Sequence, residues 1–125
     1  MISIKNKFLF IHVPKTGGNS IQNILKDYAD DKIVILNNTI QDGINRFGIQ
    51  NDKYSFFKHS PLSHYRQELN PKTYRALFKF AVIRNPWDRM ISMYFSPHQG
   101  NIKWDREKFI NIINKTQPLR YYICT

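Results

Sequence analysis

The segment 8–20 constrains the fold most, because it joins a short apolar run to a helix start through two adjacent glycines. Residues 8–13 are strand formers apart from one histidine, and a run of this length predicts a buried parallel strand. The following Pro-Lys-Thr-Gly-Gly stretch ends that strand and allows a tight turn. A helix is expected to start near Asn19 or Ser20, which are both favourable N-cap residues.

The rest of the chain alternates between strand and helix patterns. Further strands are predicted at 32–36, 54–58 and 78–83, and an irregular helix is expected within 39–52, before Gly48. Dipeptides in which Pro follows Ser or Asn, a signal for the first turn of a helix, predict helices that begin at Ser60-Pro61, Asn70-Pro71 and Asn85-Pro86. A last helix is predicted at 104–114. We therefore expect a single α/β domain over residues 1–125, with a mainly parallel sheet flanked by helices.

Composition narrows the class of protein further. The 42% hydrophobic and 14% aromatic residues exclude a disordered or low-complexity chain. The only cysteine, Cys124, excludes an internal disulfide and a cysteine-based zinc site, and it favours a reducing compartment, so we expect a cytoplasmic protein. No apolar run approaches the length of roughly 20 residues that a membrane-spanning helix needs.

The net charge of +10 is distributed unevenly along the chain. Residues 1–52 carry 6 basic and 5 acidic side chains, whereas residues 53–125 carry 13 basic and 4 acidic ones. Such an excess indicates an anionic partner, for example a nucleotide, a nucleic acid, a sulfated or phosphorylated substrate, or a membrane surface. A contribution to solubility alone is the simpler alternative.

The loop between the first strand and the first helix has the composition of an anion-binding site. Gly17 and Gly18 let backbone N–H groups approach an anion, and the helix N-terminus behind them adds partial positive charge. Within the loop and the helix start, one full charge and three polar side chains are available: Lys15, Thr16, Asn19 and Ser20. We interpret the loop as a phosphate or sulfate cradle, the alternative being a plain turn with a solvated lysine.

This loop differs from the nucleotide-binding loop of kinases and ATPases. That motif places a lysine directly before a serine or threonine, after the glycines, whereas Lys15 precedes them here. The strand at 78–83 also ends in Arg84 rather than in an aspartate that could hold magnesium. ATP-dependent phosphoryl transfer is therefore disfavoured.

A second candidate site follows the predicted strand at 78–83. Arg84 lies where that strand ends, and this edge of an open α/β sheet is where ligands bind. Ser92 lies two turns into the next helix. An arginine fork and a hydroxyl suit a terminal phosphate monoester. The alternative is a structural ion pair of Arg84 with Asp88.

The two segments together resemble the sulfotransferases that use 3′-phosphoadenosine 5′-phosphosulfate (PAPS), particularly the carbohydrate-type branch. The pattern His-Val-Pro-Lys-Thr-Gly-Gly and the later pattern Ile-Arg-Asn-Pro-x-x-Arg-x-x-Ser-x-Tyr occur in order, each between a predicted strand and a predicted helix. The resemblance implies a P-loop-like fold in which Lys15, Thr16, Gly17, Gly18, Asn19 and Ser20 hold the 5′-phosphosulfate. It implies that Arg84 and Ser92 hold the 3′-phosphate and that no metal is required.

The family also implies a base that activates the acceptor hydroxyl. His59 follows the predicted strand at 54–58, in the middle segment where the family places its base, and Lys15 would stabilise the leaving oxygen. His12 is the competing base, although a histidine inside a strand more often packs there. Lys58 is a weaker candidate for contact with the sulfuryl group or an acidic acceptor. His64 and His98 are expected at the surface. The aromatic residues Trp87, Tyr94, Phe95 and Trp104 are expected in the core, the alternative being a sugar platform, above all for Trp104.

The leading hypothesis is an enzyme that transfers a sulfuryl group from PAPS to a hydroxyl of a carbohydrate, with 3′,5′-adenosine bisphosphate as the second product. The basic second half of the chain favours an acidic glycan. The alternative is a degenerate or truncated nucleotide- or polyanion-binding module, because domains of this family run longer and their C-terminal part is missing here. Nucleic-acid binding is not expected, since the chain has no arginine-rich tract or RNA-binding signature.

Overall fold

The apolar run that begins at Phe8 forms the central strand of a three-stranded sheet in the computed structural model, which describes residues 1–41 and 43–125. Strand β2 (Phe8–Ile11) pairs antiparallel with β1 (Ile2–Ser3) and parallel with β5 (Phe78–Ala81). The α/β class is confirmed, and so are the strands predicted at 8–13 and 78–83. The sheet is small and mixed, however, so a mainly parallel sheet is not confirmed.

The strand predicted at 32–36 belongs to a second sheet. It is the first half of β3 (Lys32–Gln41), which pairs antiparallel with β4 (Ile44–Gln50) in a two-stranded hairpin. The irregular helix predicted within 39–52 is therefore wrong over β4, and residue 42 of that range lies outside the described residues. Facing pairs such as Ile35 and Phe47 explain the outcome, because β-branched and aromatic side chains stabilise paired strands.

The helices largely follow their sequence signals. They are α1 (Gly18–Leu25), α2 (Leu62–Glu68), α3 (Pro71–Ala76), α4 (Pro86–Tyr94), a short 3₁₀ helix at Pro97–Gln99, α5 (Arg106–Lys115) and α6 (Leu119–Ile123). The Asn70 side chain accepts a hydrogen bond from the Thr73 amide, and Asn85 accepts from the amides of Trp87 and Asp88. Both Asn-Pro pairs thus begin helices, as predicted.

Residues 54–58 form no strand, so that prediction is wrong. Side chains accept the amide protons that a strand would give to a neighbour: Asn51 Oδ1 accepts from the amides of Lys53 and Tyr54, at 2.9 and 3.0 Å. Further along, Glu68 accepts from the amide of Ser55. Aromatic residues here match a strand in composition, but local side-chain bonds compete with sheet pairing.

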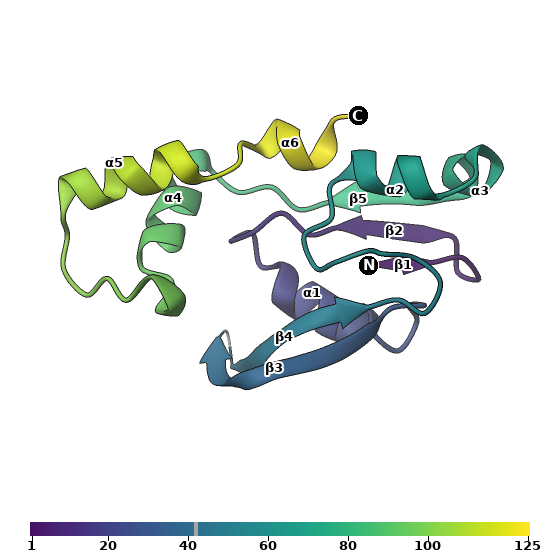
Figure 1. Ribbon diagram of the computed structural model, residues 1–125, viewed down its shortest axis with the longest axis horizontal. Coiled ribbons are helices and arrows are strands. Elements are labelled where there is room, and N and C mark those ends of the chain that lie inside the picture. The colour runs from purple at the N-terminus through teal and green to yellow at the C-terminus, as the bar shows by residue number, and fades with distance from the viewer. Residues whose placement is uncertain (42) are drawn as a thin grey trace.

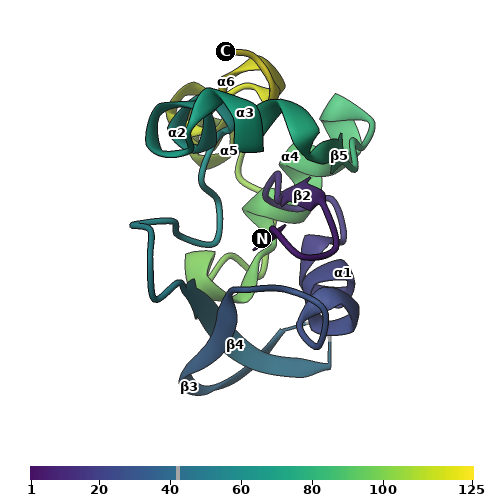
Figure 2. The ribbon, with the colours of Figure 1, turned by 90° about the vertical axis from the view of Figure 1, so that its right-hand side faces the viewer.

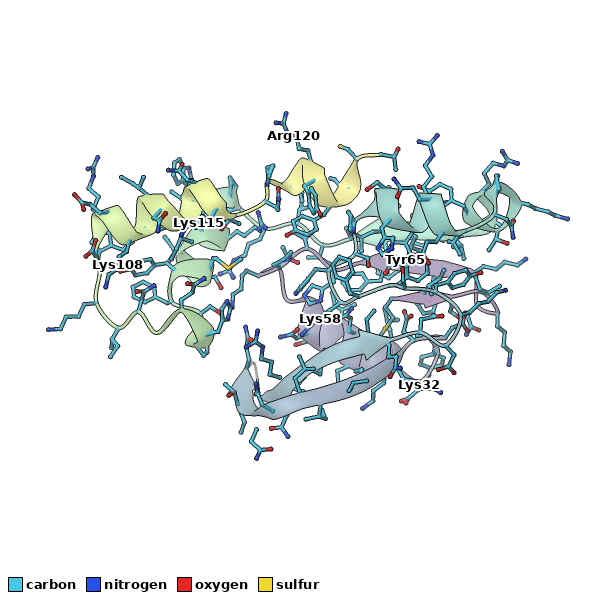
Figure 3. All side chains as sticks on the ribbon, in the orientation of Figure 1. Lys32, Lys58, Tyr65, Lys108, Lys115 and Arg120 are labelled. Carbon is cyan, nitrogen blue, oxygen red and sulfur yellow. The ribbon has the colours of Figure 1, made fainter. Side chains whose placement is uncertain are left out.

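The elements form layers around the three-stranded sheet. Figures 1 and 2 show α2, α3 and α6 on one side of it, and α1 with the β3–β4 hairpin on the other. The main apolar core lies between the sheet and the first group of helices, where Tyr65 points from α2 toward the sheet (Figure 3). Among its buried members are Ile2, Leu9, Ile11, Val13, Phe56, Tyr65, Leu69, Leu77 and Tyr122. Among the described helices, none is long and apolar enough to cross a membrane.

Arg89 connects three distant parts of the chain. Arg89 lies in α4 and is only 5% exposed. Its Nε donates to the Pro14 carbonyl at 3.0 Å, and both Nη atoms donate to the Gln117 carbonyl at 3.3 Å. One side chain therefore holds the loop before α1, helix α4 and the segment before α6 together. A charged donor with three such bonds is expected to stabilise this arrangement substantially.

Arg89→Ala should lower the free energy of unfolding by about 2–3 kcal/mol, because the Pro14 and Gln117 carbonyls lose a charged donor whose own side chain is buried. Urea denaturation measures the loss. Arg106→Ala, at an exposed position of α5, is the matched control and should change stability by less than about 0.5 kcal/mol. Equal effects of the two substitutions would contradict this role of Arg89.

Candidate functional site

The predicted site residues gather around one cavity of about 660 Å³. Its walls come from the loop before α1, the β3–β4 hairpin, residues 57–59, and the region between β5 and α4. Most of the predicted residues line it, namely Lys15, Gly17, Gly18, Asn19, Ser20, His59, Arg84 and Ser92. The volume falls within the range of roughly 300–1,000 Å³ that is typical of small-molecule sites.

Thr16 is the predicted residue that does not line the cavity. Its hydroxyl donates to the Val13 carbonyl at 2.7 Å, and the residue is 8% exposed. The Thr16 side chain therefore braces the turn from inside. Its hydroxyl is not directed at the cavity, contrary to the expectation that it faces the ligand.

The backbone of the loop takes the left-handed conformations that a tight turn needs. Lys15 has φ 65°, and Gly17, the N-cap of α1, has φ 83°. The helix therefore starts earlier than predicted, so Asn19 and Ser20 lie in its first turn and do not cap it. Gly17 offers no capping side chain, and the partial positive charge of the helix N-terminus favours an anion at this end of α1.

Gly18 is required for a different reason, which is close contact. A Cβ atom built on it would lie 2.0 Å from Cδ2 and 2.3 Å from Nε2 of His12. His12 is itself buried, and its Nδ1 lies 2.8 Å from Oε1 of Gln22. The imidazole of His12 thus packs directly against the backbone of Gly18, and only glycine fits at this position.

The two candidate anion sites lie beside each other, although they are far apart in sequence. Arg84 Nη1 donates to the Lys15 carbonyl at 3.4 Å, and Ser92 of α4 lines the same cavity. The Arg84 side chain is exposed and the structure shows no ion pair between it and Asp88 among the described residues. Two cationic side chains, Lys15 and Arg84, therefore line the same cavity.

His59 lies at the cavity with a defined tautomer. Its Nδ1 is 3.0 Å from the His12 carbonyl, and because a carbonyl only accepts, Nδ1 carries the proton and Nε2 is left with a lone pair. Burial is the main cause that lowers the pKa of His59 to about 4. The hydrogen bond to His12 acts in the opposite direction, and the charge of Lys58 adds to the lowering. His59 is therefore neutral at pH 7 and can accept a proton.

His12 also lines the cavity, a position that its place in the strand pattern did not reveal. Its ring lies 4.4 Å from that of His59, centroid to centroid, in an edge-to-face arrangement. Burial, and then His59, lower the pKa of His12 to about 2, so both imidazoles are neutral at pH 7. The Gln22 contact leaves Nδ1 of His12 protonated, because the amide oxygen accepts.

The cavity wall is electropositive. Lys15, Arg46, Lys58 and Arg84 line it, and among the described lining residues none is acidic. Lys58 lies between the sheet and the hairpin (Figure 3), where its Nζ donates to the Phe47 carbonyl at 3.0 Å and lies 3.8 Å from that ring's centroid. His98, predicted at the surface, also lines the cavity, and its pKa is lowered by burial and by Arg46 and Lys15.

The hairpin contribution to the site was missed by sequence reasoning. Arg46, Phe47 and Gln41 carry no motif, and only the pairing of β3 with β4 brings them over the loop before α1. Among the described residues, no three His, Cys, Asp or Glu side chains gather as metal ligands.

Gly18→Ala should lower the free energy of unfolding by about 1–3 kcal/mol, since the new methyl group overlaps a buried imidazole. Gly48→Ala is the matched control: it also lines the cavity, but its Cβ would meet Leu36 only at 3.6 Å, an ordinary contact. Urea denaturation compares the two variants. If Gly18→Ala proved no worse than Gly48→Ala, the close contact with His12 would be refuted.

Comparison with known proteins identifies the family of the chain. The sequence profile described as the sulfotransferase family matches residues 1–123, which include the loop with Lys15, the segment with His59 and the strand end with Arg84. Searches of curated proteins and of solved structures find no significant match. The resemblance to sulfotransferases noted from the two motifs is thereby confirmed at the level of the family, and the chain belongs to the sulfotransferase family.

Proposed function

We propose that this protein transfers a sulfuryl group from PAPS to a hydroxyl of a carbohydrate acceptor, within a single domain of P-loop-like fold. The observation that carries the proposal is the common cavity: Lys15, Arg84 and a neutral His59 all line it. Sulfuryl transfer from this donor needs a cation at each of its two anionic ends and a base near the acceptor hydroxyl.

The loop before α1 fits the 5′-phosphosulfate of the donor. Gly17 has open space where a side chain would stand, and the first amides of α1 lack a side-chain cap. In the proposal these amides, Lys15, Asn19 and Ser20 hold the phosphosulfate, and Arg84 with Ser92 holds the 3′-phosphate. The Thr16 hydroxyl takes no part, because it is bonded to Val13.

The residues present can carry the transfer without a metal. His59 Nε2 takes the proton of the acceptor hydroxyl while the new O–S bond forms and the S–O bond to the phosphate breaks. Lys15 stabilises the negative charge on the departing phosphate oxygen, and 3′,5′-adenosine bisphosphate leaves. The low pKa of His59 keeps it unprotonated before the reaction, and a bound anion next to it would raise its basicity.

The acceptor is proposed to be acidic. Arg46 and Lys58 also line the cavity, and both lie outside the groups assigned to the donor. A carboxylate or an existing sulfate on a glycan would complement them. A cytoplasmic location, favoured by the cysteine count, belongs to the same proposal.

The affinities for two adenosine nucleotides distinguish the proposed roles of the two anion sites. Lys15→Ala should weaken binding of both 3′,5′-adenosine bisphosphate and 5′-AMP by about 10–100-fold, since a charged hydrogen-bond donor is lost. Arg84→Ala should weaken the bisphosphate by a similar factor and leave 5′-AMP unchanged, because 5′-AMP has no 3′-phosphate. Isothermal titration calorimetry measures both affinities.

Lys108→Ala, at an exposed position of α5 outside the cavity lining (Figure 3), is the control and should alter neither affinity. Equal weakening of both nucleotides by Arg84→Ala would contradict the assignment of the 3′-phosphate. Nucleotide binding by the wild type without any sulfate transfer would instead support the alternative, a binding module.

His59→Ala should lower kcat by about 10²–10⁴-fold and leave the affinity for 3′,5′-adenosine bisphosphate within about threefold. In the wild type, kcat/KM should fall as the pH drops through the low pKa of His59, because the protonated imidazole cannot act as a base. Steady-state rates from pH 3 to 8 provide the profile. Turnover of the variant within a few-fold of the wild type would rule out His59 as the base.

A further inference from the structure

Residues 55–60 carry both Lys58 and His59 to the cavity, and they do so without belonging to a helix or a strand. One backbone bond closes a turn here, from the Ser60 amide to the Phe57 carbonyl at 3.0 Å, and side chains hold the rest of the segment. Glu68 Oε2 accepts from the Ser55 amide at 3.0 Å, and Ser60 Oγ accepts from the Phe57 amide at 2.8 Å. The path of the segment therefore depends on a few polar side chains.

These side chains are connected through His64 of α2. Its Nε2 lies 2.8 Å from Glu68 Oε1, and its Nδ1 lies 3.1 Å from Ser60 Oγ. Ser55 Oγ also contacts both His64 Nε2 and the Glu68 carboxylate. Since a carboxylate only accepts, Nε2 of His64 carries the proton and Nδ1 accepts from the Ser60 hydroxyl.

The proton directions agree along the whole chain of bonds. The Phe57 amide donates to Ser60 Oγ, the Ser60 hydroxyl donates to His64, and His64 donates to Glu68. The hydrogen bonds from Ser55 lower the pKa of Glu68, which keeps this end of the network an acceptor. The ring of His64 also contacts those of Phe56 and Phe57, at centroid distances of 5.4 and 5.6 Å.

A serine, a histidine and a carboxylate in this order resemble the catalytic set of a hydrolase, but the surroundings exclude that role. Ser60 is 1% exposed and does not line the cavity, and its oxygen already accepts one hydrogen bond and donates another. No reacting atom could approach it. The network therefore acts on the segment that it holds.

We infer that Ser60, His64 and Glu68 form a positioning network that fixes the backbone of residues 55–60, so that His59 keeps its bond to the His12 carbonyl and presents Nε2 to the cavity. The inference rests on the proposed function only for the use of His59 as a base. None of the three residues touches substrate in this account, and each acts through His59.

The test uses the imidazole nitrogens of His59 as the readout, because they report its tautomer whether or not the protein turns over. In the ¹⁵N NMR spectrum of histidine-labelled protein, the wild type should show His59 protonated at Nδ1. In Glu68→Ala and His64→Ala, the spectrum should change to an average of both tautomers. Glu68→Gln keeps an acceptor oxygen for His64 but loses the one that accepts from the Ser55 amide, so its spectrum should lie between those of the wild type and Glu68→Ala.

Activity supplies the second readout. Glu68→Ala and His64→Ala should lower kcat about tenfold or more while KM for the donor stays within about twofold, because misplacing a base affects the chemical step. Glu68→Gln should restore part of the loss, because it keeps one of the two acceptor oxygens. Gln67→Ala, an exposed neighbour on α2, is the control and should change neither the spectrum nor kcat.

The two claims can fail separately. A wild-type tautomer of His59 in Glu68→Ala and His64→Ala, in variants shown to be folded by circular dichroism, would overturn the positioning network. A tautomer change in these variants, together with no turnover by the wild type, would uphold the network and refute the proposed function instead.

Discussion

The parallel pairing of β2 with β5 is the constraint on which the site depends. Phe8 faces Phe78 and Ile11 faces Ala81, so both strands end at the same edge of the sheet. Parallel strands deliver the loops that follow them to one place, even when those loops are distant in sequence. The bond from Arg84 to the Lys15 carbonyl is the direct consequence of that register. Arg89 then holds the same loop to α4.

Two buried imidazoles that stay neutral among cations provide the basic group of the site. His12 and His59 both have lowered pKa values, because burial and neighbouring positive groups disfavour their charged forms. An anion that enters the cavity offsets the repulsion among Lys15, Arg46 and Lys58, and it raises the affinity of His59 for a proton. In the proposed reaction, donor binding and the strength of the base are therefore coupled.

Local signals in the sequence predicted the parts of the fold that depend on the backbone alone. The Asn-Pro helix starts and the strands at 8–13 and 78–83 are of this kind, and the two loops of the candidate site follow from them. The strand predicted at 54–58 does not form, because side chains outside the segment accept its amide protons. Glu68 accepts from Ser55, and Ser60 accepts from Phe57. Trp87 and Phe95 were expected in the core and are 68% and 45% exposed, whereas Tyr94 is buried as expected. Much of the basic charge also lies outside the cavity lining, as Lys108, Lys115 and Arg120 on α5 and α6 illustrate (Figure 3).

The central claim is that one nucleotide spans the two loops delivered by β2 and β5. A crystal structure of the protein with 3′,5′-adenosine bisphosphate tests it most directly. The account predicts the 5′-phosphate at the amides of residues 17–20 beside Lys15, and the 3′-phosphate on Arg84 and Ser92. A nucleotide bound elsewhere, or one that contacts only one of the two loops, would contradict it.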